Sequence, residues 1–437
     1  MFSKQDAKNI FDKLFAKTSF YATAIITSNE ENTTRFANSE ISQNVSITDA
    51  SLTLTLHDGK KSARCTGNVL TEDGIAALVK NAENILGIVP DGENPAFEFS
   101  KEETPEFVPS GELAKEFATN KRAQLIKEGM QAIEPGFSGA GALNLERSVY
   151  AVASSTGGLR YTAFDYVKFN VVVTHEDGSA GSGEACSYTM APDILSQFAK
   201  AQATAKSARG AASPKLGAHT VVLSPSAFGD LVFFVCYMLN AKSVIDGVSF
   251  ATGKLGQKVF GENFTVLDAA LHPELMPIGF DMEGNPKKPL TLIDKGVINS
   301  LAYDNATAKK LGAKPTGHCF SLGQGGFPIH VCVEGGDKTL DEIIADTDKG
   351  VFINEFHYTN FTNPRNLQMT GLTRNGAFLI KDGKLTEPMA TVRFTQSLID
   401  AFSSITAISS ERKLVPGYVA SLVPAVRIEN FHFTSKP

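Results

Sequence analysis

Residues 221–239 read VVLSPSAFGDLVFFVCYML, and they stand at the entrance to the second half of the chain. The stretch begins as a buried strand and ends as an apolar helix, because a short apolar run is followed by a longer one. It contains no His and a single carboxylate, Asp230. The stretch is therefore either ordinary core or a catalytic helix that has lost its chemical groups.

The composition is that of an ordinary globular protein. The chain has 437 residues, of which 42% are hydrophobic and 20% charged, which is enough for two or three compact units. The net charge of −6 argues against binding to nucleic acid or anionic membranes, because both need clustered Lys and Arg. The densest basic segment, residues 200–209, is sparse and predicts a solvated helix face.

The cysteines and the start of the chain bear on redox chemistry and location. The five cysteines Cys65, Cys186, Cys236, Cys319 and Cys332 are far apart and form no CxxC pair, so neither a disulfide framework nor a zinc knuckle is expected. The first fifteen residues lack the apolar core of a signal peptide. No window approaches the eighteen apolar residues of a membrane span. We therefore expect a cytoplasmic protein.

The first segment, residues 1–88, predicts helices packed on an antiparallel sheet. Ser3 and Asp6 resemble a capping box before a helix of amphipathic spacing, and Thr71 caps a second helix through Ile85. Between the helices, four runs are typical of strands, and the polar residues 29–32 are expected to form a turn. The strand runs are residues 20–27, 34–36, 45–47 and 52–56.

Three further segments complete the predicted organisation. Residues 89–111 are rich in Pro and acidic residues and predict a linker. Residues 112–213 predict a second α+β segment, with a long helix over residues 113–133. Residues 216–437 show short strands joined by Lys-Gly and Asp-Gly turns, which are typical of hairpins. The fold class is therefore α+β, with mixed helix and antiparallel-sheet layers followed by a β-rich C-terminal domain.

Two motifs that suggest metal or phosphate binding are explained better as structure. His175 and Glu176 begin like a helical zinc motif, but the second His is absent and Asp177-Gly178 indicates a turn. The Gly-rich residues 178–183 lack the signature of a phosphate loop and predict a flexible or close-packed loop. A second loop, residues 322–327, contains Gly323, Gly325 and Gly326, which are candidates for close approach of a peptide backbone.

The thiols offer no catalytic constellation. Cys186 and Cys236 are the candidate nucleophiles, but no base has a fixed place beside either of them. Apolar neighbours would raise the pKa of Cys236 and keep it inert, so packing is the expected role. His318 and Cys319 are adjacent in the chain, and adjacent residues rarely face each other.

Several short segments, spread over nearly the whole chain, together resemble one family. No single segment would be sufficient. They are residues 35–39 (RFANS), 280–284 (FDMEG), 294–298 (DKGVI), 310–312 (KLG), 315–318 (PTGH), 371–380 (GLTRNGAFLI) and 428–430 (IEN). In these segments the chain resembles the TldD/PmbA proteins, also called the TldD/TldE family.

One branch of that family is a metallopeptidase with an HExxxH motif after a short apolar strand, and a Cys near the C-terminus as a further zinc ligand. The spacing turns the two His about 140° apart on a straight helix, so the helix must distort to share a metal. In this chain Pro225, Ser226 and Asp230 match the His, the Glu and the second His. An alignment one residue earlier places Ser224, Pro225 and Gly229 there.

The resemblance implies a role without a metal or another cofactor. No Cys follows Cys332, so the third zinc ligand is missing as well. The chain resembles the TldE/PmbA branch, whose members lack the metal and pair with a TldD-type metalloprotease subunit that processes small unfolded peptides. The older description "modulator of DNA gyrase" refers to the same branch. The resemblance thus implies an inactive subunit and a homo- or heterodimer.

Two alternatives remain open from the sequence. The chain is a standalone homodimeric peptide-binding or regulatory protein if it has no protease partner. It is an enzyme in its own right if it uses a relocated site such as His175, Glu176 or Cys186. Direct binding to DNA is disfavoured by the charge balance.

Overall fold

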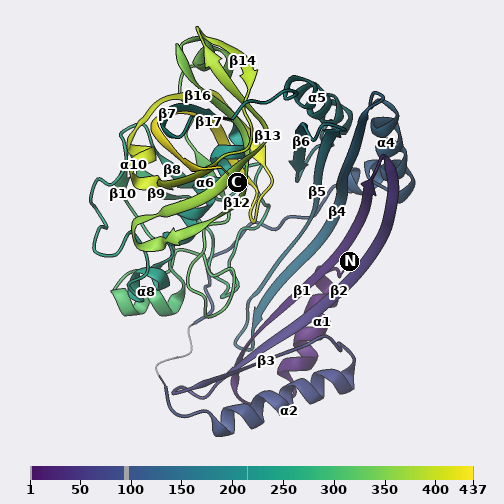
Figure 1. Cartoon of the computed structure of the whole chain (residues 1–437). Helices are drawn as coiled ribbons and strands as arrows, with labels where there is room; N and C mark the ends of the chain where they lie inside the picture. Colours follow the sequence, from purple (N-terminus) through teal and green to yellow (C-terminus); the bar gives the residue numbers. More distant parts are fainter. Residues whose placement is uncertain (1, 93–97, 214, 437) are drawn as a thin grey trace.

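Two β-sheets with helices packed on them make up the fold (Figure 1). The computed structural model describes residues 2–92, 98–213 and 215–436. A six-stranded sheet comes from the first half of the chain and an eleven-stranded sheet from the second half. This confirms the predicted α+β class with a β-rich C-terminal part. Within the predicted linker, residues 93–97 lie outside the described residues.

The first sheet is antiparallel throughout and has the order β3-β2-β1-β4-β5-β6. The predicted segments 1–88 and 112–213 both contribute to it, because β1 pairs with β4 along most of its length. The division of the chain into domains stays a prediction. The strands are β1 (Tyr21–Ala37), β2 (Glu40–His57), β3 (Ser62–Gly67), β4 (Phe137–Ser154), β5 (Leu159–His175) and β6 (Ala180–Ser187).

Strand alternation gives the two faces of this sheet different partners. On β4, Val149 and Ala151 pack under α1 and α2, and Leu143 lies on the same face under α4 and α5. Val152 points to the opposite face, where it packs against Phe280 of the second half of the chain. The helices of this half are α1 (Lys4–Phe15), α2 (Glu72–Ile88), α3 (Glu112–Glu116), α4 (Thr119–Gln131) and α5 (Ile194–Ser207).

The predicted helix caps are confirmed. The Ser3 hydroxyl accepts a hydrogen bond from the Asp6 amide at 3.1 Å, and the Asp6 carboxylate accepts from the Ser3 amide at 2.9 Å. Thr71 accepts from the Gly74 amide at 3.3 Å at the start of α2. Each cap uses backbone donors that have no partner inside the helix.

The turn predicted at residues 29–32 is wrong. Strand β1 continues through it, and the hairpin turns at Asn38 and Ser39, whose φ angles are 51° and 60°. β1 is hydrogen-bonded to β2 on one edge and to β4 on the other, so its polar middle is held by both neighbours. Glu30, for example, lies between Thr48 and Arg147. Pairing on both edges overrides the turn-forming composition.

Two other predictions need correction. The long helix expected over residues 113–133 is broken into α3 and α4, because Ala118 is extended with ψ of 153°. The Gly-rich residues expected to form a loop lie largely in strand β6. Of the two alternatives, flexible or close-packed, the structure shows close packing, since a Cβ added to Gly181 would lie 2.2 Å from the Ala201 carbonyl oxygen of α5.

The second sheet has the central order β10-β9-β8-β11-β17-β15-β13-β12-β7, with β14 beside β13 and β16 beside β17. Strand β7 also pairs with β17, so both of its edges are hydrogen-bonded. The predicted hairpin turns are confirmed at Lys295-Gly296 and Asp382-Gly383. The strands are β7 (Gly217–Leu223), β8 (Val266–Asp268), β9 (Leu290–Asp294), β10 (Val297–Ile298), β11 (Val331–Val333), β12 (Lys349–Asn363), β13 (Gln368–Lys381), β14 (Lys384–Pro388), β15 (Arg393–Ser397), β16 (Ile405–Val415) and β17 (Ser421–Ser435).

Helix α6 lies in the core of this second half and confirms the strand-then-helix prediction for residues 221–239. Ser224 caps it by accepting from the Ala227 amide at 3.2 Å, and Phe228, Leu231 and Val235 are fully buried. Among the described residues, no helix is long and apolar enough to cross a membrane. The helical elements are α6 (Pro225–Met238), α7 (Ala241–Ile245), α8 (Asn305–Leu311), α9 (Leu340–Ala345), the 3-10 turn η1 (Pro364–Asn366) and α10 (Leu398–Ser403).

Gly181→Ala tests the close approach of β6 and α5. The added methyl group would overlap backbone atoms of α5, so we expect the free energy of unfolding to fall by roughly 2 kcal/mol. Gly87→Ala is the control, because Gly87 lies in α2 with no atom within 4 Å of an added Cβ. That substitution should be neutral or slightly stabilising. Urea unfolding followed by circular dichroism compares the two, and equal midpoints would refute the close contact.

Candidate functional site

Three carboxylates from three elements are close enough to act on one another electrostatically where the two halves of the chain meet. Glu184 lies on β6, Asp230 on the second turn of α6, and Glu355 on β12. The Ser226 hydroxyl donates a hydrogen bond to Glu184, which ties the start of α6 to the six-stranded sheet. Lys413 of β16 donates to the Glu184 carbonyl oxygen at 3.2 Å. The site is therefore built from both sheets and α6.

A short hydrogen-bond network holds Glu355 in place. The Ser182 hydroxyl donates to its Oε2 at 2.5 Å, and the Asn375 amide group donates to its Oε1. Asn354 donates to Ser182 Oγ at 3.0 Å and to the Asn375 carbonyl oxygen at 3.1 Å. A carboxylate held by side chains of β6, β12 and β13 is preorganised rather than mobile.

The surroundings of Asp230 and Glu355 disfavour the ionised form of each. Burial, together with the charges of Glu184 and Glu355, raises the pKa of Asp230 to about 7. Burial also raises the pKa of Glu355, although its hydrogen bonds with Ser182 and Asn375 oppose the shift. Near neutral pH Asp230 is thus divided between a carboxylate and a carboxylic acid that can donate a hydrogen bond.

The residues at the start of α6 do not fit a zinc site. Pro225 has no side-chain donor atom, Ser226 is engaged with Glu184, and Asp230 supplies one carboxylate. Among the described residues, the one group of three His, Cys, Asp or Glu ligand atoms within 4.8 Å of one another lies elsewhere in the fold. A zinc site needs at least three such ligands, so no step is assigned to a metal here.

Two open cavities flank the carboxylates and share His357 of β12. The larger, of about 1070 Å³, is lined by charged, polar and small apolar residues, whereas several aromatic side chains line the smaller, of about 650 Å³. In the smaller one, Tyr418 stacks on Phe233 with ring centres 4.8 Å apart. The polar wall includes Thr174, Asp177, Glu355, Arg374 and Asn375, and the aromatic wall includes Phe233, Phe234, Phe356, Tyr358 and Tyr418 around Asp230.

The glycines proposed for peptide binding lie away from these two cavities. Gly325 and Gly326 are buried, and a Cβ at Gly325 would lie 2.3 Å from Asn240 Oδ1. Gly323 is exposed near Arg64 of β3. Packing inside the chain explains Gly325 and Gly326, and a peptide-binding role for the loop stays a prediction.

The structure does not assemble the relocated catalytic site considered for His175, Glu176 and Cys186. His175 ends β5, with its Nδ1 3.0 Å from Asp177, and Cys186 lies opposite Lys168 in the β5–β6 ladder. Lys168, which marks the level of Cys186 in the sheet, is seven residues before His175 on the same strand. Cys186 and His175 are therefore separated by roughly 23 Å along the strand. Burial raises the pKa of Cys186 to about 12, which keeps the thiol protonated. Burial raises the pKa of Cys236 as well.

A buried charged cluster in the second half was not found from the sequence. The Asp268 carboxylate lies 3.2 Å from His318 Nε2, 3.4 Å from His330 Nδ1 and 3.7 Å from Lys287 Nζ, and all four side chains are buried. Although burial opposes ionisation, Lys287 and His318 hold the pKa of Asp268 well below its usual value. These four residues are far apart in the sequence, so no local pattern connects them. The segment PTGH (residues 315–318), which contains His318, was the one sequence feature that could have pointed to the cluster.

Comparison with known sequences places the second half of the chain in a family. The profile of the PmbA/TldA metallopeptidase C-terminal domain matches residues 216–435. A metalloprotease of Methanothermobacter thermautotrophicus is 26% identical over 234 residues, 50% of this chain and 51% of that protein. A metalloprotease of Archaeoglobus fulgidus is 28% identical over 225 residues, 49% of this chain and 51% of that protein. The chain thus spans about half the length of the curated relatives it matches.

Solved structures share the whole fold. TldE from Thermococcus kodakarensis superposes with a TM-score of 0.85 at 20% identity, covering 98% of this chain and 99% of that one. A protein of Bacteroides thetaiotaomicron described as a modulator of DNA gyrase superposes with a TM-score of 0.86 at 20% identity and covers 100% of both chains. Identity this low shows a common fold, while the sequence profile shows common descent. The chain belongs to the TldD/PmbA family of metallopeptidase-related proteins.

Proposed function

We propose that this chain is the TldE/PmbA-type subunit of a cytoplasmic metalloprotease that processes or degrades small unfolded peptides. A TldD-type partner would supply the metal and the catalytic groups, and this chain would bind no metal on α6. The observation that carries the proposal is the start of α6, where Pro225, Ser226 and Asp230 replace the ligands and the base of the family's HExxxH motif.

The chemistry lost at these positions is specific. A zinc peptidase needs ligands with free lone pairs and a general base for the metal-bound water. Pro225 at the first position can serve as neither, and the Ser226 hydroxyl donates to Glu184. Asp230 alone is too little for tight binding of zinc. The strand and helix that present these positions are retained, so the loss is confined to side chains.

The cavities support a role in holding a peptide. The larger cavity offers charged and amide groups, and the smaller, which shares His357 with it, offers aromatic rings and Asp230. Convergent polar groups beside apolar walls are typical of ligand sites. Extended peptides commonly bind along strands, and β12 and β13 line the larger cavity. The solved structure named TldE supports the assignment to the subunit type.

Co-expression with an HExxxH-containing family member from the same genome tests the subunit role. We expect a stable complex whose mass, measured by light scattering, includes both chains and whose peptidase activity exceeds that of the partner alone. Equal activity from the partner alone would contradict the proposal. A chain that forms only homodimers and still binds unfolded peptides would instead support the standalone peptide-binding alternative.

Arg374→Ala tests the larger cavity as the peptide site. Arg374 is exposed on its wall, and no hydrogen bond of its side chain occurs among the described residues, so its guanidinium is available to a ligand. Loss of one well-placed Arg at an interface costs about 1 kcal/mol or more, so we expect binding of a fluorescent unfolded peptide to weaken at least about fivefold.

Arg365→Ala is the matched control, because Arg365 is also exposed on the β12–β13 hairpin but lies outside both cavities. Fluorescence anisotropy with the intact chain measures both variants. Equal affinity of the wild type, Arg374→Ala and Arg365→Ala would place the peptide elsewhere.

Asp230→Asn tests the shared proton. The pKa of Asp230 is raised in the folded chain to about 7, so the stability that protonation provides is present at about pH 4 and lost as the pH rises through 7. The Asn variant lacks this dependence. We expect the wild type to lose at least about 1 kcal/mol of unfolding free energy relative to Asp230→Asn between about pH 4 and about pH 8.

Asp294→Asn is the control for removing a carboxylate, because Asp294 is exposed at the end of β9. Urea unfolding at the two pH values compares all three proteins. Parallel pH profiles for the wild type and Asp230→Asn would show that Asp230 carries no excess proton in the folded chain.

A further inference from the structure

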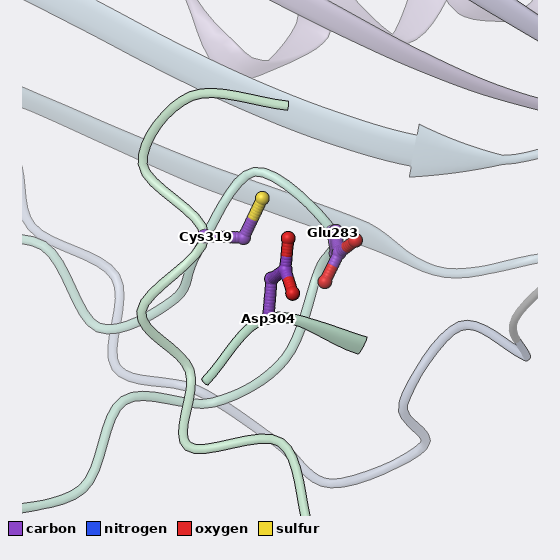
Figure 2. Close-up of side chains that lie close together, drawn as sticks. All are labelled: Glu283, Asp304 and Cys319. Atoms are coloured by element: carbon purple, nitrogen blue, oxygen red, sulfur yellow. The ribbon is translucent and has the colours of Figure 1, made fainter. Parts of the chain in front are cut away.

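Three potential metal ligands converge at a place remote in sequence from α6. The ligand atoms of Glu283, Asp304 and Cys319 all lie within 4.8 Å of one another, and Figure 2 shows the three side chains close together. They come from the turn at residues 281–285, from the residue that caps α8, and from the segment after Gly317. Asp304 and Cys319 are buried, and Glu283 is half-buried.

Surrounding hydrogen bonds orient the two carboxylates and leave one oxygen of each without a hydrogen bond in the described part of the chain. Asp304 Oδ1 accepts from the Thr307 amide at 2.8 Å and from its hydroxyl at 2.6 Å. Glu283 Oε2 accepts from the Asn305 amide at 2.8 Å. Such outer contacts fix a ligand's direction without using its second oxygen. Capping of α8 therefore accounts for only half of each carboxylate.

The thiol is an independent indication of a ligand. Cys319 is fully buried, and among the described residues its Sγ makes no hydrogen bond, yet it lies within 4.8 Å of carboxylate oxygens of Asp304 and Glu283 (Figure 2). Its backbone is held in place, because the Cys319 amide donates to Asp281 Oδ2 at 3.1 Å. The adjacent His318 turns the other way, to Asp268. Neither packing nor capping requires a thiol beside two carboxylates.

Arg64 balances the charges of the three groups only in part. Arg64 of β3 is close enough to act on Glu283, but its guanidinium donates to the Leu322 carbonyl oxygen at 3.1 Å. A divalent cation between the three ligands would supply the missing charge.

We propose that Glu283, Asp304 and Cys319 bind a zinc ion that is separate from the α6 position. A thiolate excludes Mg²⁺ and Ca²⁺, which prefer oxygen alone, whereas Zn²⁺ accepts both sulfur and carboxylate oxygen. Three protein ligands leave a fourth tetrahedral position for water. On binding, the Cys319 S–H bond breaks, a Zn–S bond forms, and the proton is released to solvent.

Such an ion would add a further link between three segments that hydrogen bonds already connect. It would link the turn at residues 281–285, the start of α8 and the segment that continues from Cys319 into the loop of residues 322–327. That loop already contacts the first sheet through the bond from Arg64 to Leu322. The zinc would therefore stabilise the junction between the two halves of the chain and take no part in peptide hydrolysis.

Zinc content and cobalt spectroscopy of the full chain test the site. We expect the wild type, incubated with zinc and desalted, to retain about one ion per chain, and Co²⁺ substitution to produce the near-ultraviolet absorption of a thiolate ligand. Cys319→Ser should abolish this absorption. Cys65→Ser, at a half-buried thiol of β3 outside the cluster, should retain it. Absence of zinc from the wild type, or cobalt–thiolate absorption that persists in Cys319→Ser, would overturn the proposal.

Two further variants keep the test decisive if Cys319→Ser does not fold. Glu283→Gln keeps the thiol and should bind zinc at least about tenfold more weakly, while unchanged affinity would overturn the site. Asp230→Asn should leave zinc binding unaltered, because its carboxylate lies on α6. Loss of zinc in Asp230→Asn with retention in Cys319→Ser would overturn this inference and, separately, the assignment of α6 as metal-free.

Discussion

Hydrogen bonding along both edges of β7 is the constraint on which the candidate site depends. β12 pairs with residues 221–223 in parallel and β17 pairs with the same residues antiparallel, so β7 cannot slide without breaking two ladders. Ser224 then accepts from the Ala227 amide and donates to the Asn354 carbonyl oxygen at 2.5 Å. The sheet therefore sets where α6 begins, whichever side chains occupy its first turn.

This separation of scaffold from chemistry explains how the fold persists while the zinc ligands are absent. The buried face of α6 still fills the core through residues such as Phe228 and Val235. Its other face meets β6 and β12, where Ser226 contacts Glu184 and Asp230 adds a third carboxylate to the cluster. A proton on Asp230 limits the repulsion, since burial makes neighbouring charges of like sign unfavourable.

Local signals in the sequence predicted local structure well. The caps at Ser3 and Thr71, the turn at Asp382-Gly383, and the strand followed by α6 depend on neighbouring residues and were correct. The failures occurred where distant strands or helices decide the outcome. Residues 29–32 form strand because β2 and β4 flank them, and Gly181 lies in a strand because α5 packs directly on it. For the site, the sequence predicted that α6 lacks zinc ligands, but neither Glu184 nor Glu355 was recognised.

What the sequence by itself determined is the identity of the side chains on α6, which include no His and no Glu, because a covalent position fixes which atoms a helix can present. Only the tertiary structure decided which distant groups surround them. Glu184, Asp230 and Glu355 meet because β6, α6 and β12 pack together, and Cys319 meets Glu283 and Asp304 because three loops converge. Such contacts join residues tens or hundreds of positions apart. The hydrophobic periodicity of a strand or a helix extends over a few neighbouring residues and cannot predict these contacts.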